Sequence, residues 1–345
     1  MAKITIKDLA QQLGVNPSTI SRALKDHPDI SPALREQVKQ LAETLHYRPN
    51  PLAVYLRRRK SNLVGLIVPN ITMFFYPYLI EGIEHVLHQH GYSLLMLPSN
   101  ESLEREIENI QICFDNDVAG LLIAFTRHTK NADHLELMEE AGTPVVMCDK
   151  VLETAPYDAV VLDDFTDAMQ AARHLFETGC RRVAGIFGNI NMRISQLRLN
   201  GFTEALKQYE LSPSRDLIYF ADNSEKAREA ARSAMQLSKP PDGIFAMSDE
   251  VIVGALAGLL DLNVKIPEDC AMIGMSDGML PPFLKPKVSF IRHDGYEVGR
   301  AAAEQLCALI AHGTHLKPFY KGKQTIIPSG LVELETTRKL ASLNL

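Results

Sequence analysis

From residue 63 to residue 292 the sequence repeats one pattern, a short apolar run followed by an amphipathic segment of helical periodicity. Strands that alternate with helices of roughly 10–15 residues predict βαβ units and parallel sheets. The number of such runs is too large for one ordinary sheet. The pattern therefore predicts an α/β core of two similar, doubly wound lobes with parallel sheets and a cleft between them.

Two series of strands are expected in this core. The first is predicted at Leu63–Val68, Tyr92–Leu97, Gly120–Ala124 and Pro144–Cys148, and the second at Ala159–Leu162, Val183–Phe187, Leu217–Phe220, Gly243–Ala246 and Ala271–Gly274. The helices between them are predicted at Pro77–His90, Leu103–Asn116, Ala132–Ala141, Asp164–Thr178, Ser195–Tyr209, Lys226–Leu237 and Glu250–Leu262. A last strand, a helix and an extended stretch would cross back between the lobes, at Ser289–Arg292, Tyr296–Ala311 and Gln324–Leu334.

Polar residues follow the predicted strands where a ligand site is expected, because open α/β sheets bind ligands at the carboxyl ends of strands. Carboxylates accept hydrogen bonds from hydroxyls and arginine donates in a fork, so this set suits a hydroxyl-rich, sugar-sized ligand. Ser248 and Asp164 also occupy positions typical of helix caps, which leaves a structural alternative open. The predicted effector site comprises Phe74, Asp149, Ser195, Arg198, Ser248, Asp249, Ser276, Asp277 and His293.

Ahead of this core, the first 24 residues predict two short helices joined by a tight turn. Thr5 is placed to cap the first helix, with Asp8 as its capping-box partner, and Gly14 can end it in a left-handed conformation. Asn16 and Pro17 have the residue types of an N-cap and a first helical position.

The second of these helices buries its apolar residues and presents Ser18, Ser21 and Arg22 to solvent. A short helix with a small polar N-terminal face and one arginine fits a DNA major groove, although an ordinary helical hairpin is an alternative. A third helix, which begins at Ser31 and Pro32, completes an all-α helix-turn-helix domain over residues 1–46.

Residues 47–60 form a cationic linker in which Asn50–Leu56 predicts a hinge helix. So short a helix is unstable alone, because nucleation is costly and few hydrogen bonds follow. It would fold only when something packs against it, unless the segment is a passive linker. The core would then span residues 61–338. Its first lobe would be about 61–158 with part of 290–325, and its second about 159–289 with the C-terminal strand.

Charge is distributed unevenly along the chain. Residues 1–60 hold 11 Lys and Arg against 5 Asp and Glu, and because the chain carries −6 in total, the remaining 285 residues carry −12. A basic head on an acidic body is typical of a nucleic-acid-binding module fused to a soluble domain.

No segment has the roughly 20 apolar residues of a membrane-spanning helix, and the N-terminus has no signal-peptide pattern. The five cysteines are scattered without a CxxC pair, which favours reduced thiols. We expect a cytoplasmic protein without membrane contact, metal site or cofactor.

Several motifs resemble the LacI/GalR (lactose-repressor/galactose-repressor) family of bacterial transcription regulators. They are TIKDLAQQLGVNPSTISRAL at Thr5–Leu24, LHYRPNPLA at Leu45–Ala53, VGLIVPN at Val64–Asn70, GTPVVMCDK at Gly142–Lys150, RLNGF at Arg198–Phe202, AMSDEVIVGAL at Ala246–Leu256 and IPEDCAMIGMSDG at Ile266–Gly278. The resemblance implies a homodimer on operator DNA, and a two-lobed core like that of periplasmic binding proteins with a small effector between the lobes.

The resemblance also implies roles for individual residues. Base-contacting positions are Pro17, Ser18 and Arg22, and phosphate-facing positions are Thr5, Asn16, Thr19 and Ser21. The hinge helix would enter the minor groove with Leu56 as an apolar wedge between base pairs. The predicted DNA-binding set also includes Tyr47, Asn50 and Ala53.

Some positions depart from the family pattern. Ser276 stands where many members have Asp and His293 where Gln is common, so no specific sugar is carried over. A solute-binding protein shares the core fold, but the basic helical head argues against it. An enzyme is disfavoured because the sequence has no P-loop, no GxGxxG after a strand, no nucleophile elbow and no metal-ligand cluster.

Overall fold

The computed structural model describes residues 4–45, 47, 61–71, 74–211, 214–313 and 320–337. The chain divides into two compact units, Met1–Asn62 and Leu63–Leu345. The predicted hinge helix, with Asn50, Ala53 and Leu56, lies outside the described residues.

The first unit contains the helices α1 (Ile6–Leu13), α2 (Pro17–Ala23) and α3 (Pro32–Thr44). They enclose a small core of Leu9, Ala10, Ile20, Ala23, Ile30, Val38 and Ala42. The predicted arrangement of three helices is therefore present. The helix α2 buries Ile20 and Ala23 in this core.

The caps of these helices agree with the sequence in position and differ in detail. Both the backbone N–H and the hydroxyl of Thr5 donate to Asp8, at 2.7 and 2.8 Å, and Gly14 ends α1 with φ +64°. Ser31 accepts from the Leu34 N–H at 3.4 Å. Asn16 occupies the N-cap of α2 as predicted, but its side chain makes no capping hydrogen bond.

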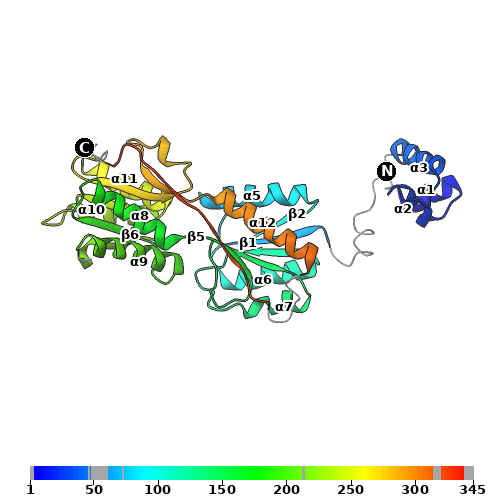
Figure 1. Ribbon diagram of the computed structural model, residues 1–345, viewed down its shortest axis with the longest axis horizontal. Coiled ribbons are helices and arrows are strands. Elements are labelled where there is room, and N and C mark those ends of the chain that lie inside the picture. The colour runs from blue at the N-terminus through cyan, green and yellow to red at the C-terminus, as the bar shows by residue number, and fades with distance from the viewer. Residues whose placement is uncertain are drawn as a thin grey trace. The chain divides into compact units, whose positions relative to one another are not determined.

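The second unit is built on two six-stranded sheets (Figure 1). The first lobe has the strand order β11-β5-β4-β3-β1-β2, all parallel, with β1 (Leu63–Val68), β2 (Ser93–Pro98), β3 (Gly120–Ile123), β4 (Val145–Cys148), β5 (Asp158–Leu162) and β11 (Gln324–Ile327). The second lobe has the order β12-β10-β9-β8-β6-β7, with β6 (Val183–Phe187), β7 (Ile218–Phe220), β8 (Gly243–Ala246), β9 (Ala271–Ser276), β10 (Ser289–Arg292) and β12 (Gly330–Val332).

One strand lies in the other lobe from the one predicted. The sequence places Ala159–Leu162 at the start of the second series, but β5 pairs in parallel with β4 and β11 in the first sheet. An apolar strand buried on both faces reads the same in either sheet, so the local pattern does not distinguish the two lobes. The boundary between the lobes falls after β5, and β12 adds an antiparallel edge through its pairing with β10.

Helices cover both faces of each sheet. In the first lobe, α5 (Phe75–Gln89) and α12 (Gly295–His312) pack on the face that includes Leu66. The other face, which includes Ile67, is covered by α6 (Leu103–Asp115), η1 (Asp133–Leu135) and α7 (Glu136–Glu140). The helices α5 and α12 approach so closely that a Cβ on Gly299 would lie 2.0 Å from the Leu79 carbonyl oxygen. Only glycine fits there.

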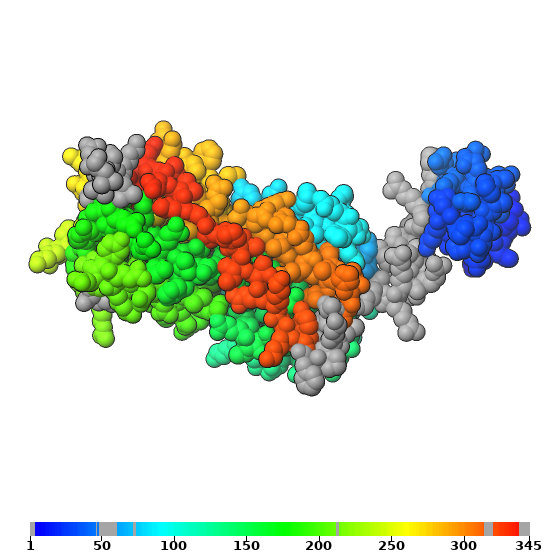
Figure 2. Space-filling model, viewed as in Figure 1, coloured from blue at the N-terminus to red at the C-terminus, as the bar shows by residue number. Residues whose placement is uncertain are grey.

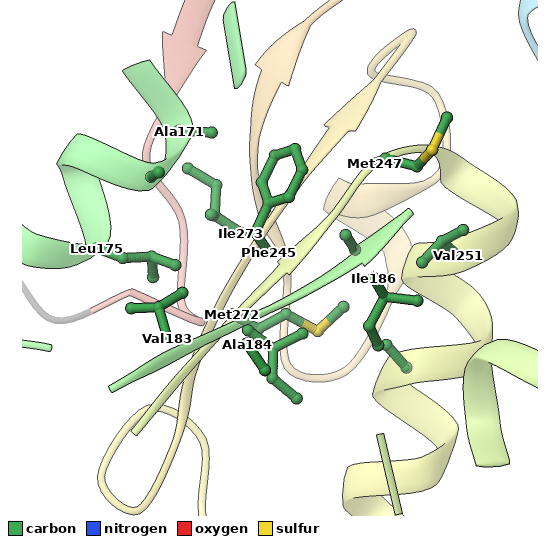
Figure 3. Packing of buried hydrophobic residues seen from close by; sticks show 14 of the residues in the cluster. Ala171, Leu175, Val183, Ala184, Ile186, Phe245, Met247, Val251, Met272 and Ile273 are labelled. Atoms are coloured by element: carbon green, nitrogen blue, oxygen red, sulfur yellow. The ribbon is translucent and has the colours of Figure 1, made fainter. Parts of the chain in front are cut away.

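The second lobe has the same layers. Figure 3 shows Ala171 and Leu175 of α8 (Asp164–Glu177) on one side of the strands and Val251 of α11 (Asp249–Asp261) on the other, with Phe245 between the layers. The remaining helices are α9 (Arg193–Gln208), which packs on α8, and α10 (Ser224–Met235), which packs on α11. Short turns η2 (Arg215–Leu217) and η3 (Pro281–Phe283) complete the lobe.

The chain crosses between the lobes three times, after β5, after β10 and after β11. The last crossing lies on the surface across both lobes (red in Figure 2). It is tied to the second lobe by the Ser329 hydroxyl, which donates to Asp167 at 2.6 Å, and by the Thr336 hydroxyl, which donates to the Met272 carbonyl at 2.7 Å. The predicted return of the chain across the lobes is confirmed.

Candidate effector cavity and DNA-binding face

The carboxyl ends of both sheets face one cavity of about 240 Å³. All nine residues of the predicted effector site line it: Phe74, Asp149, Ser195, Arg198, Ser248, Asp249, Ser276, Asp277 and His293. They come from both lobes, and they meet because parallel strands present their carboxyl ends at the same edge of a sheet. Whether they bind an effector remains a prediction.

On the first-lobe side, Asp149 directly follows β4. Its backbone has φ +60°, a left-handed conformation that non-glycine residues adopt rarely and that clusters at functional sites. The Tyr76 hydroxyl donates to its carboxylate at 2.7 Å. Burial raises the pKa of Asp149 and neighbouring Lys150 opposes that change, so the net direction is upward.

On the second-lobe side, Arg198 is buried and held by protein groups. Its guanidinium donates to Asp164 at 2.8 Å and to the Met247 carbonyl, and it lies 3.4 Å from His293 Nδ1. The sequence predicts Arg198 at the start of its helix and Asp164 as a cap. In the structure α9 begins at Arg193, and Asp163 caps α8 by accepting from Thr166 at 3.0 Å. Asp164 is therefore free to pair with the arginine instead.

His293 follows β10 and joins the cavity to the surface crossing. Its Nε2 lies 3.2 Å from an Asp167 carboxylate oxygen, within ion-pair distance but without the alignment of a hydrogen bond. The same Asp167 oxygen accepts from Ser329. His293 thus contacts both Arg198 and the carboxylate that anchors the last crossing.

The acidic side chains of the second lobe form the opposite wall. Ser248 caps α11 as predicted, accepting from Val251 at 3.4 Å, and the Ser276 hydroxyl donates to Asp249. Burial, with a smaller contribution from the negative Asp277, raises the pKa of Asp249 to about 7 against the opposing effect of the Ser276 hydrogen bond. Burial also raises the pKa of Asp277, whose Oδ2 is buried without a hydrogen-bond partner.

Apolar side chains provide most of the remaining lining. Ser195 is fully buried, and its hydroxyl lies 3.8 Å from the Met247 sulfur. Phe74, at the N-terminus of α5, is an exposed aromatic side chain. The other apolar lining residues are Phe75, Leu162, Met192, Ile194, Ala221, Met247, Val251 and Met275. The cavity therefore offers carboxylate acceptors and an apolar surface, which suits a ligand with hydroxyl donors and C–H faces.

Sequence reasoning missed several polar lining residues. Glu101 follows β2, Arg127 follows β3 and Asp222 follows β7, so the strand-end rule would have found them if it had been applied to every strand. Lys150 follows Asp149 directly. Tyr76 carried no such signal, because it lies within the first turn of α5 and only packing directs its hydroxyl to Asp149.

In the first unit, the predicted DNA-contacting residues lie on or beside α2. Asn16, Pro17, Ser18, Arg22 and the α1 cap Thr5 are exposed, whereas Thr19 and Ser21 are half-buried. Exposure is what a base-contacting or phosphate-contacting side chain requires. Tyr47 is half-buried against the core of this unit, and burial raises its pKa.

Over the part of the chain that the structure describes, no group of histidine, cysteine, aspartate or glutamate side chains is arranged to hold a metal ion. Nor does any helix in these described ranges have the length and apolarity needed to cross a membrane. The five cysteines are all buried, and burial raises the pKa of Cys113 to about 12.

A helix-turn-helix unit joined to a two-lobed core with a cavity defines a class: regulators that bind DNA and respond to a small molecule. Two family models match this chain. "Bacterial regulatory proteins, lacI family" covers residues 5–50, and "Periplasmic binding proteins and sugar binding domain of LacI family" covers residues 61–329. The chain belongs to the LacI family, and it is a DNA-binding transcriptional regulator, not an enzyme.

Individual relatives agree. The chain is 34% identical over 307 residues to the ribose operon repressor of Bacillus subtilis, covering 89% of this chain and 91% of the repressor. It is 29% identical over 299 residues to the transcriptional repressor CytR of Escherichia coli, covering 86% and 87%. Among solved structures, a Lac repressor dimer bound to operator and an anti-inducer matches with a TM-score of 0.84 at 19% identity, over 97% of this chain and 99% of that one.

Proposed function

We propose that the cavity binds a small, hydroxyl-rich effector, a sugar or sugar derivative, and that a homodimer of this chain binds operator DNA under its control. The observation that carries the proposal is the convergence of Asp149, Asp249 and Asp277 on one cavity with an apolar lining. Carboxylates accept from hydroxyls, and an acceptor such as Asp277 Oδ2 needs a donor from a ligand or water.

The relatives support the same effector class. One of them is named as a repressor of a ribose operon, and the family model that spans the core is described as sugar binding. The solved Lac repressor, which shares the fold, is a dimer on its operator, which supports the proposed assembly.

On DNA, we assign base readout to the exposed face of α2. Arg22 has the reach and the forked donors to contact a guanine edge, while Pro17 and Ser18 are short and contact bases by shape. Thr5, Asn16, Thr19 and Ser21 would face phosphates, and Tyr47 would lie near the backbone. The hinge residues Asn50, Ala53 and Leu56 would enter the minor groove, with Leu56 as the wedge.

The effector and DNA would be coupled through the two lobes. A ligand that contacts both walls of the cavity changes the relation between the lobes, and so the spacing of two hinges in a dimer. Because a short hinge helix is marginal, a small change decides whether it folds. The two affinities would then be linked by one reciprocal free energy, typically about 1–3 kcal/mol.

The effector can be found by thermal unfolding of the full chain with a panel of sugars, sugar acids, sugar phosphates and nucleosides. A ligand at 100 times its Kd stabilises the folded state by about 2.7 kcal/mol, which is readily measured. The Asp277→Asn variant should bind the hit at least about tenfold more weakly, because a hydrogen bond to a charged acceptor contributes about 1.5–3 kcal/mol.

The matched control is Asp261→Asn, which removes the same charge from the exposed end of α11. Binding that is equal in both variants would contradict the assignment of the cavity. Operator sequences selected from random DNA by the protein itself then allow the second test. The hit should change operator affinity, and operator DNA should change the affinity for the hit by the same factor.

A further inference from the structure

The cations that line the cavity share one feature, which is that each of them already contacts a carboxylate. Arg198 pairs with Asp164 at 2.7 Å. On the other wall, Lys150 and Arg127 both contact Glu101. Among the described lining residues, these are the only lysine and arginine side chains, so an anionic ligand would have to displace a carboxylate to reach any of them.

Glu101 holds its two partners with three contacts. Its Oε1 accepts from Lys150 Nζ at 2.6 Å, and its Oε2 accepts from the Arg127 backbone N–H at 2.8 Å. The Arg127 Nε lies 3.4 Å from the same Oε2, close enough for an ion pair but not aligned as a hydrogen bond. The Glu101 side chain is only 21% exposed, so water screens these contacts little.

The backbone is arranged to present this carboxylate. Asn100 and Glu101 have φ +51° and +57°, two consecutive left-handed residues without a glycine. Such conformations cost free energy and persist where the surrounding structure requires them. Burial alone would raise the pKa of Glu101, but Lys150 and Arg127 outweigh it and the pKa is lowered. The group is ionised at neutral pH.

Among the lining residues that the structure describes, the remaining walls carry carboxylates and no further lysine or arginine. Asp149 is beside Lys150, and the opposite wall carries Asp222, Asp249, Glu250 and Asp277. A phosphate or carboxylate on a ligand would either be repelled by these carboxylates or require their protonation, and both cost free energy in a partly desolvated site. A neutral polyol avoids this cost and can donate to the same carboxylates.

We propose that Glu101 is a specificity-determining residue, which neutralises Lys150 and Arg127 and thereby selects neutral polyols over phosphorylated or acidic sugars. The inference rests on the proposed function of the cavity and adds the charge class of its effector. Glu101 is decisive because its loss frees two cations at once. Loss of Asp164 frees one cation and removes two of the contacts that hold Arg198.

The test is the Glu101→Gln variant of the full chain. Glutamine keeps the size of the side chain and an acceptor for one of the hydrogen bonds, but removes the charge. Calorimetric titration with ribose, ribose 5-phosphate and inorganic phosphate would be compared with wild type. We expect at least a tenfold gain in affinity for the two phosphates and no comparable gain for any neutral sugar that binds.

Two control variants make the result specific. Glu108→Gln removes an exposed carboxylate of α6, so any phosphate bound elsewhere on the chain is the same in both variants. Glu101→Asp retains the charge and should retain the rejection of phosphates. A gain of twofold or less in Glu101→Gln, or an equal gain in Glu108→Gln, would overturn the proposal.

Ligand binding by the wild-type protein is a second test of the role of Glu101, and it does not depend on whether Glu101→Gln folds. If it binds ribose 5-phosphate or inorganic phosphate more tightly than every neutral sugar of the panel, Glu101 does not have this role. If no neutral sugar binds but Glu101→Gln gains phosphate affinity, the role of Glu101 stands and the proposed sugar effector fails. The two failures are therefore distinguishable.

Discussion

Replacement of Asp249 should change the free energy of unfolding by an amount that depends on pH. Burial, with a smaller contribution from negative Asp277, raises the pKa of Asp249 from 3.8 to about 7. The folded state then binds this proton more tightly than the unfolded state. The stability that the proton provides is fully present below pH 3.8 and is lost as the pH rises to about 7.

The magnitude follows from that change. At 1.36 kcal/mol for each pH unit between the two pKa values, ionised Asp249 lowers the free energy of unfolding by about 4 kcal/mol. Asparagine keeps an acceptor for the Ser276 hydroxyl, but its amide group cannot accept from the Asp277 backbone N–H, a loss of about 1 kcal/mol. We expect Asp249→Asn to stabilise the core by about 2–4 kcal/mol at pH 8 and not to stabilise it at pH 4.

Urea unfolding of the full chain, followed by far-UV circular dichroism from pH 4 to pH 8.5, measures this difference. The control is Asp222→Asn, whose carboxylate is also at the cavity but has a lowered pKa because Lys226 donates to it. That variant should give no stabilisation at high pH. A difference between Asp249→Asn and wild type that does not vary with pH would refute the reasoning.

Other predictions concern DNA and packing. Arg22→Ala should remove about 1–3 kcal/mol of preference for operator over random DNA in competition assays, and an unchanged preference would rule out Arg22 as the base reader. Leu56→Ala should weaken operator binding while calorimetry shows unchanged effector binding, and an equal loss of both would argue against a separable hinge. Phe245→Ala should destabilise the second lobe by about 3–5 kcal/mol in thermal unfolding, because this side chain is fully buried, whereas half-exposed Phe220→Ala should cost much less.

The raised pKa of Asp249 is itself informative about function. A buried carboxyl that opposes folding when ionised persists where activity requires it, and ligand hydroxyls would stabilise the ionised form. Effector binding should then be tighter above pH 7 than below it, if the effector donates to this group. The same residue would thus reduce the stability of the free protein and contribute to binding.

Local sequence determined the secondary structure and the polar edge of the sheets. Gly14 and Ser31 occupy the turn and the cap predicted for them, because a left-handed residue and an N-cap depend on immediate neighbours. The rule for strand ends brought residues such as Asp149, Asp249 and His293 to one cavity, because the direction of parallel strands follows from the βαβ order alone.

Tertiary structure decided what local pattern leaves open. The assignment of β5 to the first sheet depends on its pairing with β4 and with β11, a strand far away in sequence whose Gln324 pairs with Ala159. Likewise Arg198, predicted as a ligand contact, already donates to Asp164 and to the Met247 carbonyl and lies beside His293. Glu101 acquires its role only where Lys150 and Arg127 meet it. Helix and strand periodicity depend on neighbours in sequence, whereas charge pairing in a cavity depends on distances in space that periodicity does not contain.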